Sequence, residues 1–95
     1  MRLDHNISSF LKTGLKEIEK DSEVYLFGSR VDDSQKGGDI DILWLTKEKV
    51  PQKTIRKFKV EFYKKFGLRK LDIVNFRFDQ KDLFKEISLQ KAIEL

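Results

Sequence analysis

The sequence predicts a small α/β (α+β) domain in which helices flank a mixed β-sheet of about three strands. Segments of helical apolar spacing alternate with short runs of β-branched and aromatic residues, and turn-forming residues separate them. A chain of 95 residues buries somewhat under about 70% of its unfolded surface, which is enough for one modest core. We therefore expect a single domain over residues 1–95.

The first half of the chain predicts a helix followed by two strands. The helix is expected from about Asp4 to Lys20, although Gly14 inside it costs about 1 kcal/mol relative to alanine. Its apolar stripe consists of Ile7, Phe10, Leu11, Leu15 and Ile18. Two apolar runs, Val24–Phe27 and Ile40–Leu45, then predict strands with a polar, Gly-containing loop between them.

The second half begins with another helix and a third strand. Pro51 suits a first helical position, and Gly67 supplies a C-terminal cap. The helix between them has its apolar positions at Ile55, Phe58, Phe62 and Phe66. The alternating segment Leu71–Phe76 predicts the third strand.

A last helix is expected to begin at a cap formed by Asp79, with Asp82 in its first turn. Leu83, Phe84 and Ile87 are expected to form its inward face. Residues 88–95 either continue this helix or break it.

The strand ends should bring three aspartates together. As antiparallel neighbours, the first two strands place the end of one beside the start of the other. Asp39 and Asp41 then share a face of the sheet, about 7 Å apart at their Cα atoms. The third strand follows through a helix, which is the usual connection between parallel neighbours, so Asp72 should lie beside Asp41 on a strand about 4.8 Å away.

Such a set of residues favours a metal and phosphate site. Neighbouring carboxylates repel each other and resist burial, so a cation relieves them, and hard oxygen ligands favour Mg²⁺ or Mn²⁺. Gly28 lets the backbone approach a ligand closely, and Ser29 offers a hydroxyl and an N–H group to a phosphate oxygen. Arg30 and Lys36 add positive charge nearby. Each feature alone is more often a simple turn or a solvated residue, but their order and spacing together predict a nucleoside triphosphate held with Mg²⁺.

The composition bears on the cellular compartment of the protein and on its binding partners. The chain has no cysteine, which excludes a disulfide framework and suits the cytoplasm, and no apolar run resembles a signal peptide or a membrane span. The net charge of +4 is concentrated in residues 47–70, which hold ten Lys or Arg against two Glu. This basic surface is either a solvated face or a docking surface for RNA or an acidic protein.

The chain resembles the minimal nucleotidyltransferase domain of the DNA polymerase β superfamily, on the residues Gly28-Ser29, Asp39-Ile40-Asp41 and Asp72. That signature is a strand ending in Gly-Ser, a loop, Asp-x-Asp opening the next strand, and a third carboxylate on a later strand. The resemblance covers nearly the whole chain and implies a polymerase β-like fold. Two positions depart from the common pattern, since Val31-Asp32-Asp33 replaces an Ala-x-Gly element and Gly38 replaces a serine.

The resemblance also implies roles for the individual residues. Gly28 and Ser29, with Arg30 beside them, would bind the phosphates of ATP, and Asp39 and Asp41 would bind two Mg²⁺ ions. Asp72 would complete the metal site that activates the attacking hydroxyl. Two such metals stabilise both the attacking and the leaving oxygen of an in-line displacement.

Family members of this size resemble the antitoxin of HEPT/MNT toxin–antitoxin modules, whose partner is an all-helical HEPT protein. This resemblance implies transfer of AMP from ATP to a hydroxyl on that partner protein, an AMPylation. Two alternatives stay open. The domain could be a non-catalytic binding module that neutralises its partner by covering it, or a transferase acting on RNA or a small hydroxylated molecule.

Overall fold

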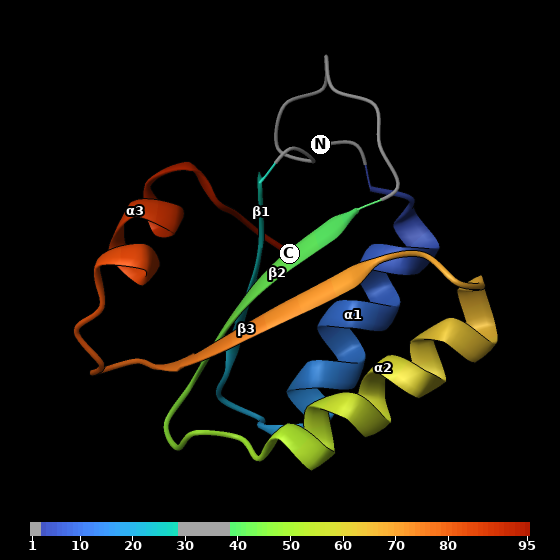
Figure 1. Ribbon diagram of the computed structural model, residues 1–95, viewed down its shortest axis with the longest axis horizontal. Coiled ribbons are helices and arrows are strands. Elements are labelled where there is room, and N and C mark those ends of the chain that lie inside the picture. Colours follow the sequence, from blue (N-terminus) through green and yellow to red (C-terminus); the bar gives the residue numbers. More distant parts are fainter. Residues whose placement is uncertain (1–2, 29–38) are drawn as a thin grey trace.

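The computed structural model describes residues 3–28 and 39–95 and contains, in those residues, three helices and one four-stranded sheet (Figure 1). This is the mixed α/β class that the sequence predicts, with one strand more than expected. The elements in chain order are α1 (His5–Ile18), β1 (Glu23–Phe27), β2 (Ile40–Thr46), α2 (Gln52–Phe66), β3 (Leu71–Arg77), α3 (Leu83–Lys91) and β4 (Ile93–Glu94).

The strand order in the sheet is β3-β2-β1-β4. β1 pairs antiparallel with β2, and β3 pairs parallel with β2 after the crossover through α2, so both expected pairings are confirmed. The additional strand, β4, pairs antiparallel with β1. Just beyond it, the Leu95 N–H donates to the Val24 carbonyl at 2.9 Å. Because β4 has only two residues, no period-2 pattern in the sequence could predict it.

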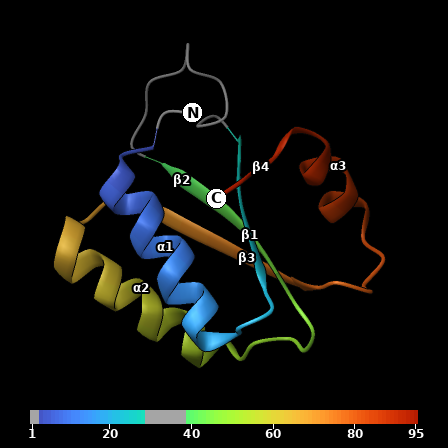
Figure 2. The same cartoon turned by 180° about the vertical axis from the view of Figure 1, so that it is seen from behind.

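Two helices cover one face of the sheet. α1 and α2 lie side by side on that face, and Figure 2 views the molecule from their side. Ile40, Ile42 and Trp44 of β2 point into the core beneath these helices and are fully buried. Trp44 is thus a core residue and lies on the face of β2 opposite Asp41.

Gly14 has a packing role in this layer. A Cβ atom added to it would lie 2.5 Å from Cε1 of Phe58, so the absence of a side chain allows the Phe58 ring to pack against α1. The aromatic residues of α1 and α2 continue this contact, with the Phe10 and Phe58 ring centroids 5.5 Å apart. A glycine that weakens the helix locally therefore improves the packing of the two helices.

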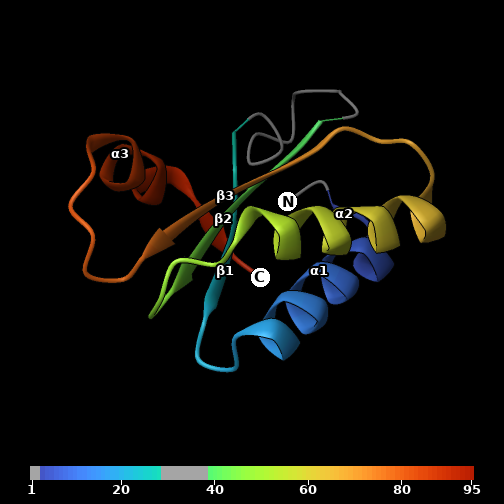
Figure 3. The ribbon, with the colours of Figure 1, turned by 60° about the horizontal axis from the view of Figure 1, so that its bottom comes forward.

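The opposite face of the sheet carries a smaller apolar cluster, in which Leu43, Leu45 and Phe76 are buried and Leu89 of α3 packs against them. α3 stands apart from the layer of α1 and α2, as Figure 3 shows. Within the described part of the chain, none of the helices has the length and apolar character needed to cross a membrane.

The start of α3 differs from the expectation. Asp82, not Asp79, is its N-cap, and the Asp82 carboxylate accepts a hydrogen bond from the Lys85 N–H at 3.1 Å. The side chain of Lys85 is buried, and its Nζ donates to the carbonyls of residues 77, 78 and 80 at 2.9, 2.7 and 2.9 Å. These bonds hold residues 77–80 in a turn, so the helix begins only after them.

The expected inward face of α3 is confirmed in part, because the Phe84 ring packs against Phe27 and Phe76 of the sheet with centroids 5.8 and 6.3 Å apart, whereas Leu83 and Ile87 do not belong to that face. Leu83, Phe84 and Ile87 are 72%, 50% and 56% exposed. Leu89 packs against the apolar cluster on this face of the sheet, and Lys85 is buried because its Nζ reaches the carbonyls of the preceding turn. Apolar residues of α3 therefore lie uncovered beside the sheet.

Candidate active site

Two of the predicted carboxylates occupy matching positions on neighbouring parallel strands. Asp41 of β2 pairs with Asp72 of β3, one position after the pairing of Ile40 with Leu71. The Ile40 N–H donates to the Lys70 carbonyl at 2.9 Å and fixes the register where both strands begin. The predicted juxtaposition of Asp41 and Asp72 is confirmed.

Both carboxylates lie on the side of the sheet that carries α3. Ile40 and Ile42, on either side of Asp41, point into the core under α1 and α2, so the alternation of the strand directs Asp41 to the opposite face. Asp72 follows the same rule, because its neighbours Leu71 and Ile73 belong to the helix-covered core. Each of the two aspartates is partly buried.

Asp39 directly precedes β2 and is exposed, whereas the sequence placed it at the opening of the strand. Its negative charge nevertheless reaches Asp41, whose pKa it raises. Among the described residues, no three acidic or histidine side chains are already close enough together to hold a metal ion. The three aspartates are therefore neighbours at one edge of the sheet, and their carboxylates would have to move together to share an ion.

Gly28 adjoins the Asp41 side chain. It follows β1 directly, and β1 ends at the pairing of Phe27 with Asp41. In Figure 1, the end of β1 and the start of β2 lie at the same edge of the sheet. Gly28 has a φ of 80°, and a Cβ atom added to it would lie 2.5 Å from the Asp41 Oδ2 atom. The position thus requires glycine both for its backbone conformation and for space beside the carboxylate.

The electrostatics of this edge disfavour a charged Asp41. Burial raises the pKa of Asp41 above its usual 3.8, and the charges of Asp72 and Asp39 raise it further. Lys70 acts in the opposite direction and lowers the Asp41 pKa. A divalent cation beside Asp41 would neutralise the negative charges that raise its pKa.

Lys70 is a residue that sequence reasoning missed, because it was counted only within the basic segment. The signal was available, since Lys70 stands two positions before Asp72 and alternation places such residues on one face of a strand. The predicted phosphate-binding residues Ser29 and Arg30, and the nearby Lys36, lie outside the described residues.

Comparison with known families agrees with this geometry. A family model described as polymerase beta, nucleotidyltransferase matches residues 6–95. The chain belongs to this family. The match includes both described strands that carry aspartates, and the mixed sheet with its flanking helices agrees with a polymerase β-like nucleotidyltransferase fold. A search among curated proteins finds no match.

Membership in the polymerase beta, nucleotidyltransferase family gives the general activity of the chain. The chain is a nucleotidyltransferase, an enzyme of the class that transfers nucleotidyl groups. Within this nucleotidyltransferase, the edge of the sheet that carries Gly28, Asp41 and Asp72 is the candidate active site.

Proposed function

We propose that this nucleotidyltransferase moves a nucleoside monophosphate, AMP from ATP, to a hydroxyl on a partner protein, and that it is the antitoxin of a HEPT/MNT pair. The observation that carries the chemistry is the in-register pair of Asp41 and Asp72, with Asp39 next to it. Paired carboxylates at a strand edge that also carries a glycine suit a nucleotide bound with divalent cations.

The donor set fits Mg²⁺. Three carboxylates, with no cysteine anywhere in the chain, are hard oxygen ligands of the kind that Mg²⁺ prefers. The raised pKa of Asp41 has the sign expected where negative charge lacks a counter-ion. Asp39, Asp41 and Asp72 would hold the ions, which in such sites neutralise the charge that develops on the transferred phosphoryl group.

Residues of the chain would also bind the phosphates of the nucleotide and activate the acceptor hydroxyl. We assign phosphate binding to Gly28, which lets the backbone approach the phosphates closely, and to Ser29 and Arg30, which offer a hydroxyl and a positive charge. Asp72 lies on β3, at one edge of the described sheet, and we assign to it the orientation of the attacking hydroxyl and the acceptance of its proton. The acceptor oxygen bonds to the α-phosphorus as the bond to the pyrophosphate oxygen breaks, and pyrophosphate leaves with the electron pair.

A protein acceptor is supported by the surface next to the site. Leu83, Phe84 and Ile87 are exposed on α3, and α3 packs on the same face of the sheet as the carboxylates. Exposed apolar side chains that lie next to one another often mark a surface that binds another protein. A partner that covers them would sit beside the candidate active site and could bring its own hydroxyl into it.

The test is transfer of label from α-phosphate-labelled ATP, with Mg²⁺, to proteins in a lysate of the host. We expect a labelled protein band with the native chain and none with Asp39→Asn/Asp41→Asn. The matched control is Asp21→Asn/Asp79→Asn, which removes two exposed aspartates whose ion pairs, to Lys47 and Arg77, lie away from the site. This control should retain labelling, because exposed ion pairs contribute little to stability.

Three outcomes would contradict the proposal. Equal labelling by the Asp39/Asp41 variant would remove the carboxylates from the chemistry. Label on RNA in place of protein would make the acceptor a nucleic acid. A partner captured equally by both chains, without any label, would leave a non-catalytic binding module.

A further inference from the structure

The outward face of α2 carries a row of cations. Lys53, Arg56, Lys57 and Lys64, here called the α2 basic stripe, are exposed and follow one another at spacings of three, one and seven residues. This spacing places them on one side of the helix, opposite the buried Ile55, Phe58 and Phe62. At 1.5 Å per residue, the stripe extends over about 16 Å.

The stripe is poorly neutralised within the chain. Lys64 lies 3.4 Å from a carboxylate oxygen of Glu61, and this is the single ion pair of the stripe among the described residues. Lys53, Arg56 and Lys57 form none with the described part of the chain. Such a row of like charges repels itself, and an external polyanion would relieve the repulsion.

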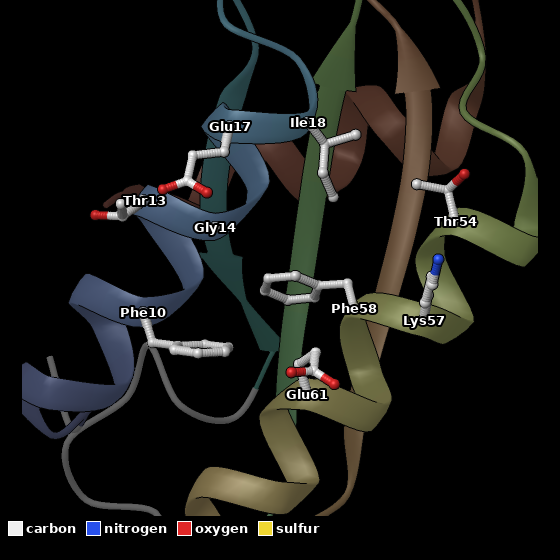
Figure 4. A pocket seen from close by; sticks show the side chains of 9 residues that line it. All are labelled: Phe10, Thr13, Gly14, Glu17, Ile18, Thr54, Lys57, Phe58 and Glu61. Carbon is white, nitrogen blue, oxygen red and sulfur yellow. The ribbon is translucent and has the colours of Figure 1, made fainter.

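An apolar groove lies beside the stripe, between α1 and α2. It has a volume of about 610 Å³, and Figure 4 shows the Phe10 and Phe58 side chains projecting into it from the two helices. Thr13 and Thr54 also line the groove, and their hydroxyls point away from the two rings. Lys57 lines the groove and also belongs to the stripe, so the two features adjoin.

We propose that the α2 basic stripe and this groove form a docking surface for single-stranded RNA. The phosphates would follow the cations, and an unpaired base would enter the groove against the phenylalanine rings. Aromatic stacking beside a positively charged track is the usual way in which single strands are bound. The side-chain oxygens of Glu17 and Glu61, which also line the groove, can accept hydrogen bonds from base amino groups.

The composition of the stripe favours RNA over an acidic protein. The cores of protein–protein interfaces are depleted in lysine and built on apolar or aromatic anchors. Val60 is the one apolar residue exposed on this side of α2. Interfaces with nucleic acid are more polar and much more positively charged, as the stripe is. A duplex would satisfy the cations but could not place a base in the groove, so a single strand is the better occupant.

This surface is separate from the candidate active site. α1 and α2 cover one face of the sheet, whereas Asp41 and Asp72 lie on the other. RNA binding therefore goes beyond the proposed transfer reaction and does not depend on it. The Asp39→Asn/Asp41→Asn variant should bind RNA as the native chain does, which separates a failure of one proposal from a failure of the other.

The first experiment measures the fluorescence anisotropy of a labelled RNA of about 12 nucleotides at increasing salt. Four phosphate contacts to a single strand give a slope of log K against log salt of about −2.8, and so about a 50-fold loss of affinity between about 50 and 200 mM salt. Replacing all four stripe cations by glutamine should abolish this dependence. The matched control replaces four other exposed lysines by glutamine, Lys12, Lys20, Lys81 and Lys91, and should retain most of the binding.

A second variant tests the groove. Thr13 is exposed on α1 and lines the groove, so Thr13→Trp should fill it without removing a cation. We expect this variant to lose the preference for single-stranded over duplex RNA and to keep the salt dependence. Absence of RNA binding at low salt, or equal binding by the stripe variant and its control, would overturn the proposal. If the native chain bound polyglutamate as tightly as RNA, the assignment of the surface to RNA would be overturned. If it bound duplex RNA as tightly as single-stranded RNA, the groove would have no part in the binding.

Discussion

Replacing Gly28 by alanine tests the link between backbone geometry and the candidate active site. The φ of 80° at this position is unfavourable for alanine, and such conformations cost about 1–3 kcal/mol. The new Cβ would also lie 2.5 Å from the Asp41 Oδ2 atom, whereas ordinary contacts begin at 3.4 Å. The carboxylate therefore has to move by about 0.9 Å, and a displacement of about 1 Å at a reacting centre can reduce the rate about 100-fold.

Gly67 provides a matched control. Its φ is 87°, but a Cβ atom added there meets no atom within 4 Å. Gly67→Ala should thus show the backbone penalty alone, while Gly28→Ala should show the penalty and the displaced carboxylate. In thermal unfolding, a loss of about 1–3 kcal/mol lowers the Tm of a domain of this size by roughly 5–20 °C.

The two variants are compared by thermal unfolding and by transfer of label from ATP. We expect both to lose stability, and Gly28→Ala alone to lose transfer and the rise in Tm on addition of Mg²⁺. Transfer by Gly28→Ala at the level of Gly67→Ala would refute the reasoning, because it would mean that the position of Asp41 beside Gly28 does not matter for the chemistry.

Three further predictions concern charge and packing. The pKa of Asp41 is raised, so the folded metal-free chain holds this proton more tightly than the unfolded chain. Stability without metal should therefore fall as the pH rises from about 3.8 through the raised pKa, and Asp41→Asn should remove this fall, as measured by thermal unfolding in chelator. Lys85→Met should cost about 1.5–3 kcal/mol in chemical unfolding, because three carbonyls lose a charged donor. Overpacking against Phe58 should cost Gly14→Ala about 1–3 kcal/mol, and the gain in helix propensity of about 1 kcal/mol leaves a net destabilisation of up to about 2 kcal/mol.

Each of these predictions has a contrary result. A metal-free native chain that becomes more stable as the pH rises through this window would contradict the raised pKa of Asp41. A neutral Lys85→Met would mean that water replaces its three hydrogen bonds without loss. Thr13→Ala, at the exposed position next to Gly14, is the control for helix propensity, and a Gly14→Ala chain as stable as this control would rule out the overpacking.

The sequence predicted the elements that follow strong local patterns. The stripe of α1 apart from the exposed Ile18, the alternation of β3 and the Gly67 cap of α2 were each visible in residue spacing and appear in the structure. The placement of Asp72 beside Asp41 needed one further rule, that a helical crossover joins parallel neighbours, and this rule held. The site geometry could be predicted that far because it depends on strand direction more than on side-chain detail.

The failures concern α3, where tertiary contacts override local pattern. Asp79 and Asp82 were both reasonable caps, and the choice between them depends on the buried Lys85 ammonium, which no periodicity reveals. Leu83 and Ile87 are exposed on the same helix, where Lys85 occupies a buried position, while the half-exposed Phe84 still packs against Phe27 and Phe76. The tight approach of Gly28 to Asp41 was not predicted either, because the expected pairing of β1 with β2 brings their ends together without setting the distance between the Gly28 backbone and the Asp41 side chain.

The register between β2 and β3 also bears on how the lengths of related chains can diverge. Asp39 directly precedes β2 and Asp41 is the second residue of that strand, so a residue inserted between them would change the side to which one carboxylate points relative to the other. The position of Asp72 is set instead by hydrogen bonding to β2, and α2 with its turns could lengthen or shorten without moving it. The number of residues between Asp41 and Asp72 can therefore differ among related chains, whereas the single residue between Asp39 and Asp41 cannot. A search for relatives that fixed both intervals would overlook chains that build the same site.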